Sequence, residues 1–198
     1  ASTAARGVAS RLRSRLPQLE QVAVFAAFVE IDKSLIATGS GAGLEGAVAD
    51  AFGIDATIQA NIKRLCADPF EGDPLGESFL ILSKTLEDKS RSKACHILVR
   101  NDFSGRFAIL KIPGIECLFI TVPEGGHLAA DGRILVPGAV HRLPPGSILA
   151  DDHRVRIYPA ELAAAFSADA EALAHLHFEG RHLDFRYKGS DDIGLHDF

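Results

Sequence analysis

The stretch RFAILKIPGIECLFITV, residues 106–122, decides the fold class of this chain. Two apolar runs of strand length, Arg106–Lys111 and Cys117–Val122, flank the turn-forming pair Pro113-Gly114. Apolar runs bounded by turn residues are typical of β-strands. The sequence therefore predicts a β-sheet here.

The residues on either side continue the same pattern. Turn signals such as Asp131-Gly132 and Pro144-Pro145-Gly146 recur every 8–12 residues or so, a spacing typical of a β-sandwich or barrel. The further predicted strands are His96–Arg100, His127–Ala129, Arg133–Leu135 and Arg154–Tyr158, and Ala160–Phe166 is predicted to form a short helix.

The first 70 residues have a helical period instead. Val8, Leu12 and Leu16 recur at i, i+4 and i+8, and Pro17 closes this amphipathic stripe. Gly53 is a predicted helix stop and Asp55 a predicted helix cap. The three helices predicted after Pro17 are Leu19–Ile36, Leu44–Phe52 and Ala56–Ala67.

These patterns together predict an α+β chain: an N-terminal helical bundle, a small all-β sandwich and a C-terminal strand pair. The charged run Glu87–Lys93 has no apolar residue and is the best boundary, whereas Glu77–Leu86 is left open between helix and strand. Leu173–Tyr187 is a second strand-like region. The predicted divisions are a helical domain at 1–70, a linker at 71–93, a sandwich at 94–166 and a separate C-terminal part at 167–198.

Composition excludes several classes of protein. The 198 residues include 21 basic and 26 acidic side chains, a formal net charge of −5, which disfavours sequence-independent nucleic-acid binding. The three cysteines, Cys66, Cys95 and Cys117, form no C-x-x-C pair and lie among apolar neighbours. They are interpreted as buried structural thiols in a reducing compartment.

Catalytic motifs are missing from the sequence. No G-x-S-x-G, H-E-x-x-H or G-x-x-x-x-G-K-[ST] occurs. The best metal-like cluster is His175 and His177 with His182 and Asp184, but the same alternation is typical of a half-exposed strand. His153 beside Asp151-Asp152 has the residue types of an acid–base pair, but Asp-Asp-His within a turn is more typical of a solvated corner, which is the interpretation favoured. No catalytic residue and no metal ligand is predicted.

The stretch FEGRHLDFRYKGSDDIGLHDF, residues 178–198, resembles the opening β-hairpin of ABC-type ATPases. In that family an aromatic side chain of the first strand stacks on adenine, so the resemblance implies that Tyr187 binds the cofactor ATP. The phosphate-binding loop that follows in the family does not occur before Phe198. The resemblance therefore implies that 167–198 is the truncated start of an ATPase domain, that this piece holds no cofactor by itself, and that ATP and Mg²⁺ bind the longer parent.

Two upstream segments carry further resemblances. Glu30-Ile31-Asp32 with Leu44–Ile54 resembles the TerB-type helical domain, although Lys33 replaces the usual Gly. Gly126–Ile148 with Val155–Tyr158 is similar to a forkhead-associated-like sandwich, without its phosphothreonine-reading motifs. In this order, the segments resemble the N-terminal accessory region of certain bacterial ABC transporter ATP-binding proteins.

The resemblance implies a non-catalytic accessory or regulatory region that couples a partner or self-association to ATP-driven transport. Its implied partners are its own ABC ATPase domain and a membrane permease, with a homodimer left open and no nucleic acid. The implied location is cytoplasmic, at the inner face of the membrane, and the full-length parent would be an ATPase. Two alternatives stay open: a free-standing protein- or phosphopeptide-binding adaptor, and a small hydrolase or metal enzyme that uses His175, His177 and His182.

Overall fold

A computed structural model describes residues 2–37, 43–71, 73–85, 95–167, 185–186 and 193–195 of the chain. The chain divides into two units, Ala1–Phe166 and Ser167–Phe198. In the described residues helices come first and strands follow, so the predicted α+β class, with its helical bundle, sandwich and C-terminal strand pair, is confirmed.

The helices begin and end where local sequence signals place them. Gly53 adopts a left-handed conformation with φ of 69° and donates its N–H to Asp50 O, which ends α3. Asp55 caps α4 by accepting the Thr57 N–H at 2.7 Å. The four N-terminal helices are α1 (Ser2–Arg13), α2 (Gln18–Ala37), α3 (Leu44–Phe52) and α4 (Ala56–Cys66).

Two sheets follow the helices. The larger sheet has the order β2-β1-β3-β4-β7, with β1 and β2 parallel and every other neighbour antiparallel. The smaller sheet has the antiparallel order β6-β5-β8-β9. A short helix, α5 (Pro159–Phe166), follows β9. The strands are β1 (Phe79–Ser83), β2 (His96–Val99), β3 (Arg106–Lys111), β4 (Leu118–Thr121), β5 (Leu128–Ala130), β6 (Arg133–Ile134), β7 (Val140–Leu143), β8 (Leu149–Asp151) and β9 (Arg156–Ile157).

Three of these strands were not predicted as such. The segment left open at 77–86 contains β1, which lies inside the stretch predicted as a linker, and all five residues of β1 are buried. A strand that is covered on both faces shows no polar alternation, so its period is uninformative. The other two are β7, whose middle residues are His141 and Arg142, and β8, which is only three residues long.

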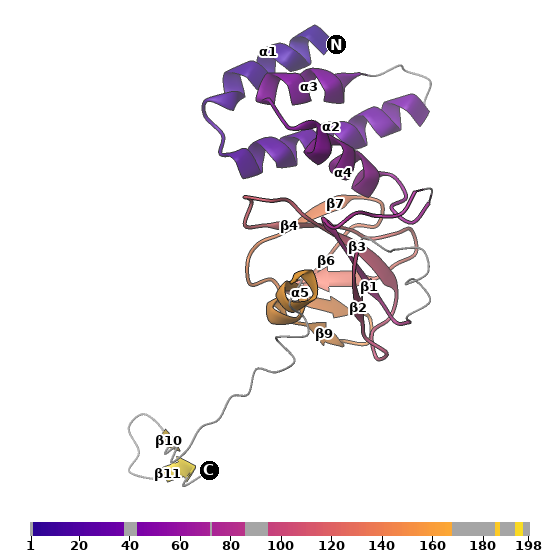
Figure 1. Cartoon of the computed structure of the whole chain (residues 1–198), viewed down its shortest axis with the longest axis vertical. Helices are drawn as coiled ribbons and strands as arrows, with labels where there is room; N and C mark the ends of the chain where they lie inside the picture. The colour runs from indigo at the N-terminus through magenta and orange to yellow at the C-terminus, as the bar shows by residue number, and fades with distance from the viewer. Residues whose placement is uncertain are drawn as a thin grey trace. The chain divides into compact units, whose positions relative to one another are not determined.

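The larger sheet is the middle layer of the first unit, as Figure 1 shows. One of its faces packs against the helices and contributes Ile81, Leu110 and Phe119 to a core that also contains Phe25 of α2. Its other face contributes a second set of side chains, which pack with the smaller sheet and with α5. Side chains alternate between these two cores, so that along β3 Leu110 faces the helices and Ile109 faces the second sheet.

Polar contacts also join the helices to the middle sheet. The Glu30 carboxylate of α2 accepts the Val140 N–H at the start of β7. Further along β7, Arg142 Nη1 lies 2.7 Å from Glu20 Oε1. Both contacts tie α2 to the edge strand β7, so the helices and the larger sheet belong to one packed body within Ala1–Phe166.

In the second unit the structure describes one antiparallel strand pair. β10 (Phe185–Arg186) pairs with β11 (Ile193–Leu195), and Phe185 lies opposite Leu195. Across the described parts of both units, no helix is both long enough and apolar enough to cross a lipid bilayer.

Candidate functional site

The residues that sequence patterns singled out near the C-terminus lie outside the described residues. They are Tyr187, His175, His177, His182 and Asp184. The described strand β10 ends at Arg186, one position before Tyr187. The adenine contact of Tyr187 therefore stays a prediction, and so does the interpretation of the histidines.

Asp32 and Glu45, which lie in the two stretches whose sequence resembles a TerB-type domain, have structural contacts. Asp32 is 2% exposed, and its Oδ2 accepts the N–H groups of Gly43 at 3.2 Å and Glu45 at 2.8 Å, so it caps the start of α3. Glu45 Oε1 forms an ion pair with Lys63 Nζ at 3.2 Å. Within the ranges that the structure describes, no three metal-binding side chains gather at one point.

The Asp151-Asp152-His153 corner is built around one buried carboxylate. Asp151 is 6% exposed and accepts the Ser104 N–H and the Val155 N–H, both at 2.8 Å. Asp152 is exposed and accepts the Ser104 hydroxyl, a bond that lowers the pKa of Asp152. His153 is exposed and lies 3.7 Å from Asp152, so the predicted solvated corner fits Asp152 and His153 but not the buried Asp151.

Acidic side chains also surround the only arginine of the neighbouring β2–β3 turn. Arg100 contacts both oxygens of Asp102 at 3.0 Å and also donates to Glu161 of α5. Its hydrogen bonds hold the pKa of Asp102 below the ordinary value. Arg100 is therefore neutralised by two carboxylates, and Asp151 and Asp152 lie nearby through their contacts with Ser104. This end of the sandwich is a poor place for a phosphate group.

A hollow with mostly apolar walls lies between α5 and the loops at the other end of the middle sheet. Its volume is about 360 Å³. One wall is α5, the second is the β3–β4 turn, and the third is the turn that follows β7. The lining side chains include Ile115, Cys117, Leu118, Leu143, Pro144, Pro145, Pro159, Leu162, Ala163 and Phe166, with Lys111, Glu116 and Ser147 as polar members. We call this hollow the α5 groove.

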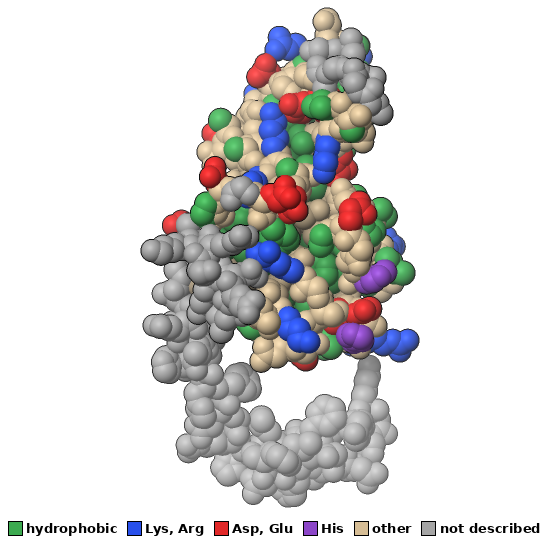
Figure 2. Space-filling view, turned by 90° about the vertical axis from the view of Figure 1, so that its right-hand side faces the viewer, with side chains coloured by type: hydrophobic (Ala, Val, Ile, Leu, Met, Phe, Trp, Pro, Cys, Tyr) green, Lys and Arg blue, Asp and Glu red, His purple; other side chains and the backbone are tan. Residues whose placement is uncertain are grey.

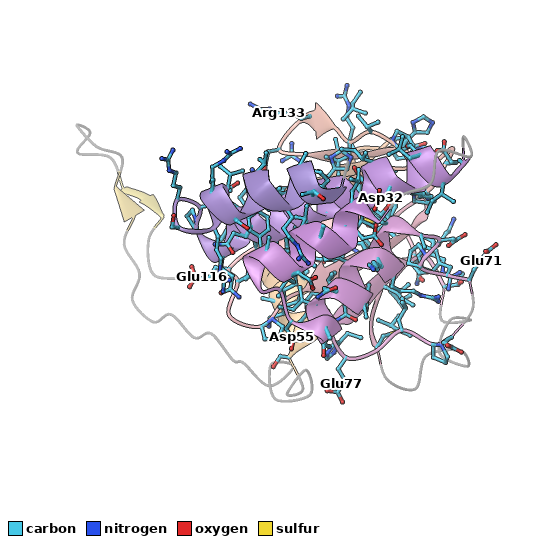
Figure 3. The ribbon with its side chains drawn as sticks, turned by 90° about the horizontal axis from the view of Figure 1, so that it is seen from above. Asp32, Asp55, Glu71, Glu77, Glu116 and Arg133 are labelled. Atoms are coloured by element: carbon cyan, nitrogen blue, oxygen red, sulfur yellow. The ribbon has the colours of Figure 1, made fainter. Side chains whose placement is uncertain are left out.

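The chemistry of the α5 groove is that of a binding site for an apolar group. Lys111 Nζ lies 5.5 Å from the centre of the Phe166 ring and pairs with no described carboxylate. Glu116 is exposed and projects away from the ribbon at the edge of the unit (Figure 3). Pockets of this size with apolar walls and few polar groups are typical of ligand sites. An apolar ligand with a negative charge near Lys111 fits best.

Cys117 contributes to the groove as an inert thiol. It is 5% exposed, and its Sγ donates to the Leu143 carbonyl oxygen at 3.3 Å. Burial raises the pKa of Cys117, and burial also raises that of Cys66 to about 12. Thiols with raised pKa values are poor nucleophiles at neutral pH, so both fit the predicted role of structural cysteines.

Sequence reasoning missed the α5 groove, although it identified the pieces. Pro144-Pro145-Gly146 was interpreted as a turn and Ala160–Phe166 as a short helix, both of which the structure contains. Their meeting depends on the pairing of β4 with β7 and on the packing of α5 against β2. A search of family models, curated proteins and solved structures found no match to the chain.

Proposed function

We propose that this chain is a non-catalytic accessory region of an ABC transporter ATP-binding protein, which couples a partner or self-association to ATP-driven transport. The observation that carries the proposal is the antiparallel pairing of β10 with β11. This pair occupies the stretch whose sequence resembles the opening hairpin of ABC-type ATPases. It follows a folded unit of helices and sandwich, the order of parts that the resemblance implies.

The described polar side chains support a structural role for the first unit. Asp32 caps a helix, Asp151 holds two loops, and Arg100 joins α5 to the β2–β3 turn. Asp32 Oδ2, both oxygens of Asp151 and the Arg100 guanidinium have partners within the fold, whereas Asp32 Oδ1 is buried without a hydrogen-bond partner among the described residues. A unit whose buried charges maintain its own shape is suited to binding and positioning, which need a fixed surface.

The central position of the larger sheet, which contributes to both cores, suggests how the region would act. Because the helices and the smaller sheet pack on opposite faces of the larger sheet, the unit Ala1–Phe166 would move as a single body. In the proposed parent, ATP binding brings two ATPase cores together. A partner that binds this body in only one state of the ATPase would shift that equilibrium.

Replacing Tyr187 by Ala in the full-length parent is expected to weaken ATP binding roughly 5- to 150-fold, the range that follows from the loss of one base-stacking aromatic. The matched control is Tyr158→Ala, because Tyr158 is the other tyrosine of the chain and is 48% exposed at the end of β9. This control is expected to leave ATP affinity unchanged. Isothermal titration calorimetry with ATP measures both. Equal affinity of wild type and Tyr187→Ala would contradict the assigned role.

A second candidate function, a protein-binding adaptor, is favoured by the α5 groove. The proposed ligand is an apolar peptide side chain with a neighbouring carboxylate beside Lys111. The acidic surroundings of Arg100, Asp151 and Asp152 make phosphopeptide binding at that end of the sandwich the less favoured form of this candidate.

The groove is tested with 8-anilinonaphthalene-1-sulfonate, an apolar anion. Saturable dye binding is expected, several-fold weaker in Lys111→Gln and strongly reduced in Ala163→Glu, because Ala163 is an exposed groove residue where a carboxylate repels the dye. The control is Ala160→Glu, an exposed position of α5 that does not line the groove. Dye binding that is equal in all four proteins would count against a groove ligand of this chemistry.

A further inference from the structure

The N-terminal helix α1 is basic in a chain that is otherwise acidic. Residues 1–19 contain four arginines and no acidic side chain, whereas residues 20–198 carry 17 basic and 26 acidic side chains, a net charge of −9. On the face of the molecule that Figure 2 shows, basic and acidic side chains are interspersed. Positive charge is therefore concentrated on α1 and the turn that follows it.

The four arginines divide into two pairs with different surroundings. Arg6 Nη2 forms an ion pair with Asp50 Oδ2 at 2.8 Å, and Arg13 Nη1 donates to the Ala51 carbonyl oxygen at 3.4 Å, so both are turned toward α3. Arg11 and Arg15 are exposed, and their guanidinium groups contact no described acidic residue. The second pair has its charge available to a partner.

Arg11 of α1 and Arg15 of the turn after α1 lie on one open surface. With Val8, which is 44% exposed, and with Leu12 and Ser14, they line a shallow hollow of about 410 Å³. The adjoining side of the helix is fixed, because Ala9 is buried in the core and Leu12 packs against it. Figure 1 shows α1 at the end of the first unit that lies away from the sheets, and Val8, Arg11 and Arg15 are all exposed. We call this surface the open α1 face.

We propose that the open α1 face docks on the anionic headgroups of a lipid bilayer. Two guanidinium groups pair with lipid phosphates by charge complementarity, and Val8 reaches the interfacial region. Each basic residue near an anionic bilayer strengthens binding about fivefold. The proposal rests on the proposed function in one respect: a permease would hold the unit beside the membrane, where modest affinity is effective.

A bilayer fits this face better than a nucleic acid does. A bilayer is a flat partner that contacts one helix face at the end of the unit, without approaching the acidic remainder of the chain. An extended polyanion that follows the surface would meet that net charge of −9. The exposed Val8, which lines the same hollow as Arg11 and Arg15, also has a use at a lipid interface and none at a phosphate backbone.

The test is co-sedimentation of this 198-residue chain with vesicles of phosphatidylcholine mixed with phosphatidylglycerol at low salt. Arg11→Gln/Arg15→Gln is expected to lower the partition coefficient about 25-fold, the product of two fivefold effects. The matched control, Arg6→Gln/Arg13→Gln, removes the same charge from the same helix and is expected to lose much less. Vesicles of phosphatidylcholine alone, or added salt, are expected to abolish binding.

Several outcomes would overturn the proposal. Equal losses in the two double variants would show that only net charge matters, and equal binding to neutral vesicles would show that charge does not. Binding to single-stranded DNA without binding to vesicles would identify a different partner. Circular dichroism at helix wavelengths verifies that each variant is folded. Tyr187→Ala is expected to bind vesicles like the wild type, so failure of the lipid proposal is distinguishable from failure of the ATPase assignment.

Discussion

Replacing Phe119 by Ala is expected to lower the free energy of unfolding by about 3–5 kcal/mol. Phe119 lies on β4, is 1% exposed, and belongs to the core between the middle sheet and the helices. It also borders a small hollow of about 200 Å³ that Ala23 and Ala27 of α2 line. Truncation removes the largest side chain of β4 from this interface, and the backbones of α2 and β4 cannot close the space without moving.

Phe119→Ala is expected to destabilise the helices and the larger sheet together, because both contribute side chains to the core around Phe119. Because helices and strands bury side chains in the same core, α2 and β3 are expected to lose protection together in urea, as hydrogen exchange with mass spectrometry measures. The control is Ile134→Ala at a position that is 81% exposed, for which the change is expected to stay within about 0.5 kcal/mol. Independent unfolding, with β3 protection unchanged while α2 protection is lost, would contradict a single packed body.

The second large effect is expected at Asp151. Replacing this carboxylate by Ala leaves the Ser104 and Val155 N–H groups without their acceptors, at an expected cost of about 2–4 kcal/mol. Asp151 also holds a loop with an unfavourable backbone conformation, because Arg154 adopts a φ of 63°, in the left-handed region that residues other than glycine rarely occupy. Chemical denaturation monitored by circular dichroism measures the loss.

Two variants separate the role of Asp151 from a general charge effect. Asp151→Asn keeps one carbonyl oxygen as an acceptor, so about half of the loss is expected. Asp152→Ala removes the same charge from an exposed neighbour and is expected to cause little change. An Asp152→Ala variant as unstable as Asp151→Ala would show that charge, and not the two backbone hydrogen bonds, explains the effect.

The helices and most strands were predictable because their signals are local. Pro17, Gly53 and Asp55 act through backbone geometry and short-range hydrogen bonds, and the structure places helix ends beside all three. The strands around Pro113-Gly114 have the same kind of signal, and β3 matches its predicted range Arg106–Lys111. Side-chain chemistry and short spacing were sufficient for these elements.

The layer arrangement was not predictable, because it depends on contacts between distant parts of the chain. In β1, Ile81 faces the helices and Leu80 faces the second sheet. Because both faces of β1 are apolar, the sequence pattern does not indicate which face packs against which layer. The short strand β8 is defined by its pairing with β5, such as Ala150 opposite Ala129, and not by its own three residues. Such pairings appear only when the chain has folded.

The candidate sites divide in the same way. The resemblance around Tyr187 is a local motif, so the sequence alone supplied a residue and a role. The α5 groove and the open α1 face depend on tertiary placement. Lys111 contacts the Phe166 ring, which is distant in sequence. Arg6 forms an ion pair with Asp50 of α3, whereas Arg11 contacts no described acidic residue. The sequence showed four arginines near the N-terminus, but not which two remain available.

The central claim is that this region precedes an ABC ATPase core, and the coding sequence downstream of Phe198 in the parent gene tests it most directly. The account predicts a phosphate-binding loop of the form G-x-x-x-x-G-K-[ST] within a few tens of codons, placed between a strand and a helix. A stop codon directly after Phe198, or a long downstream reading frame without that loop, would contradict it.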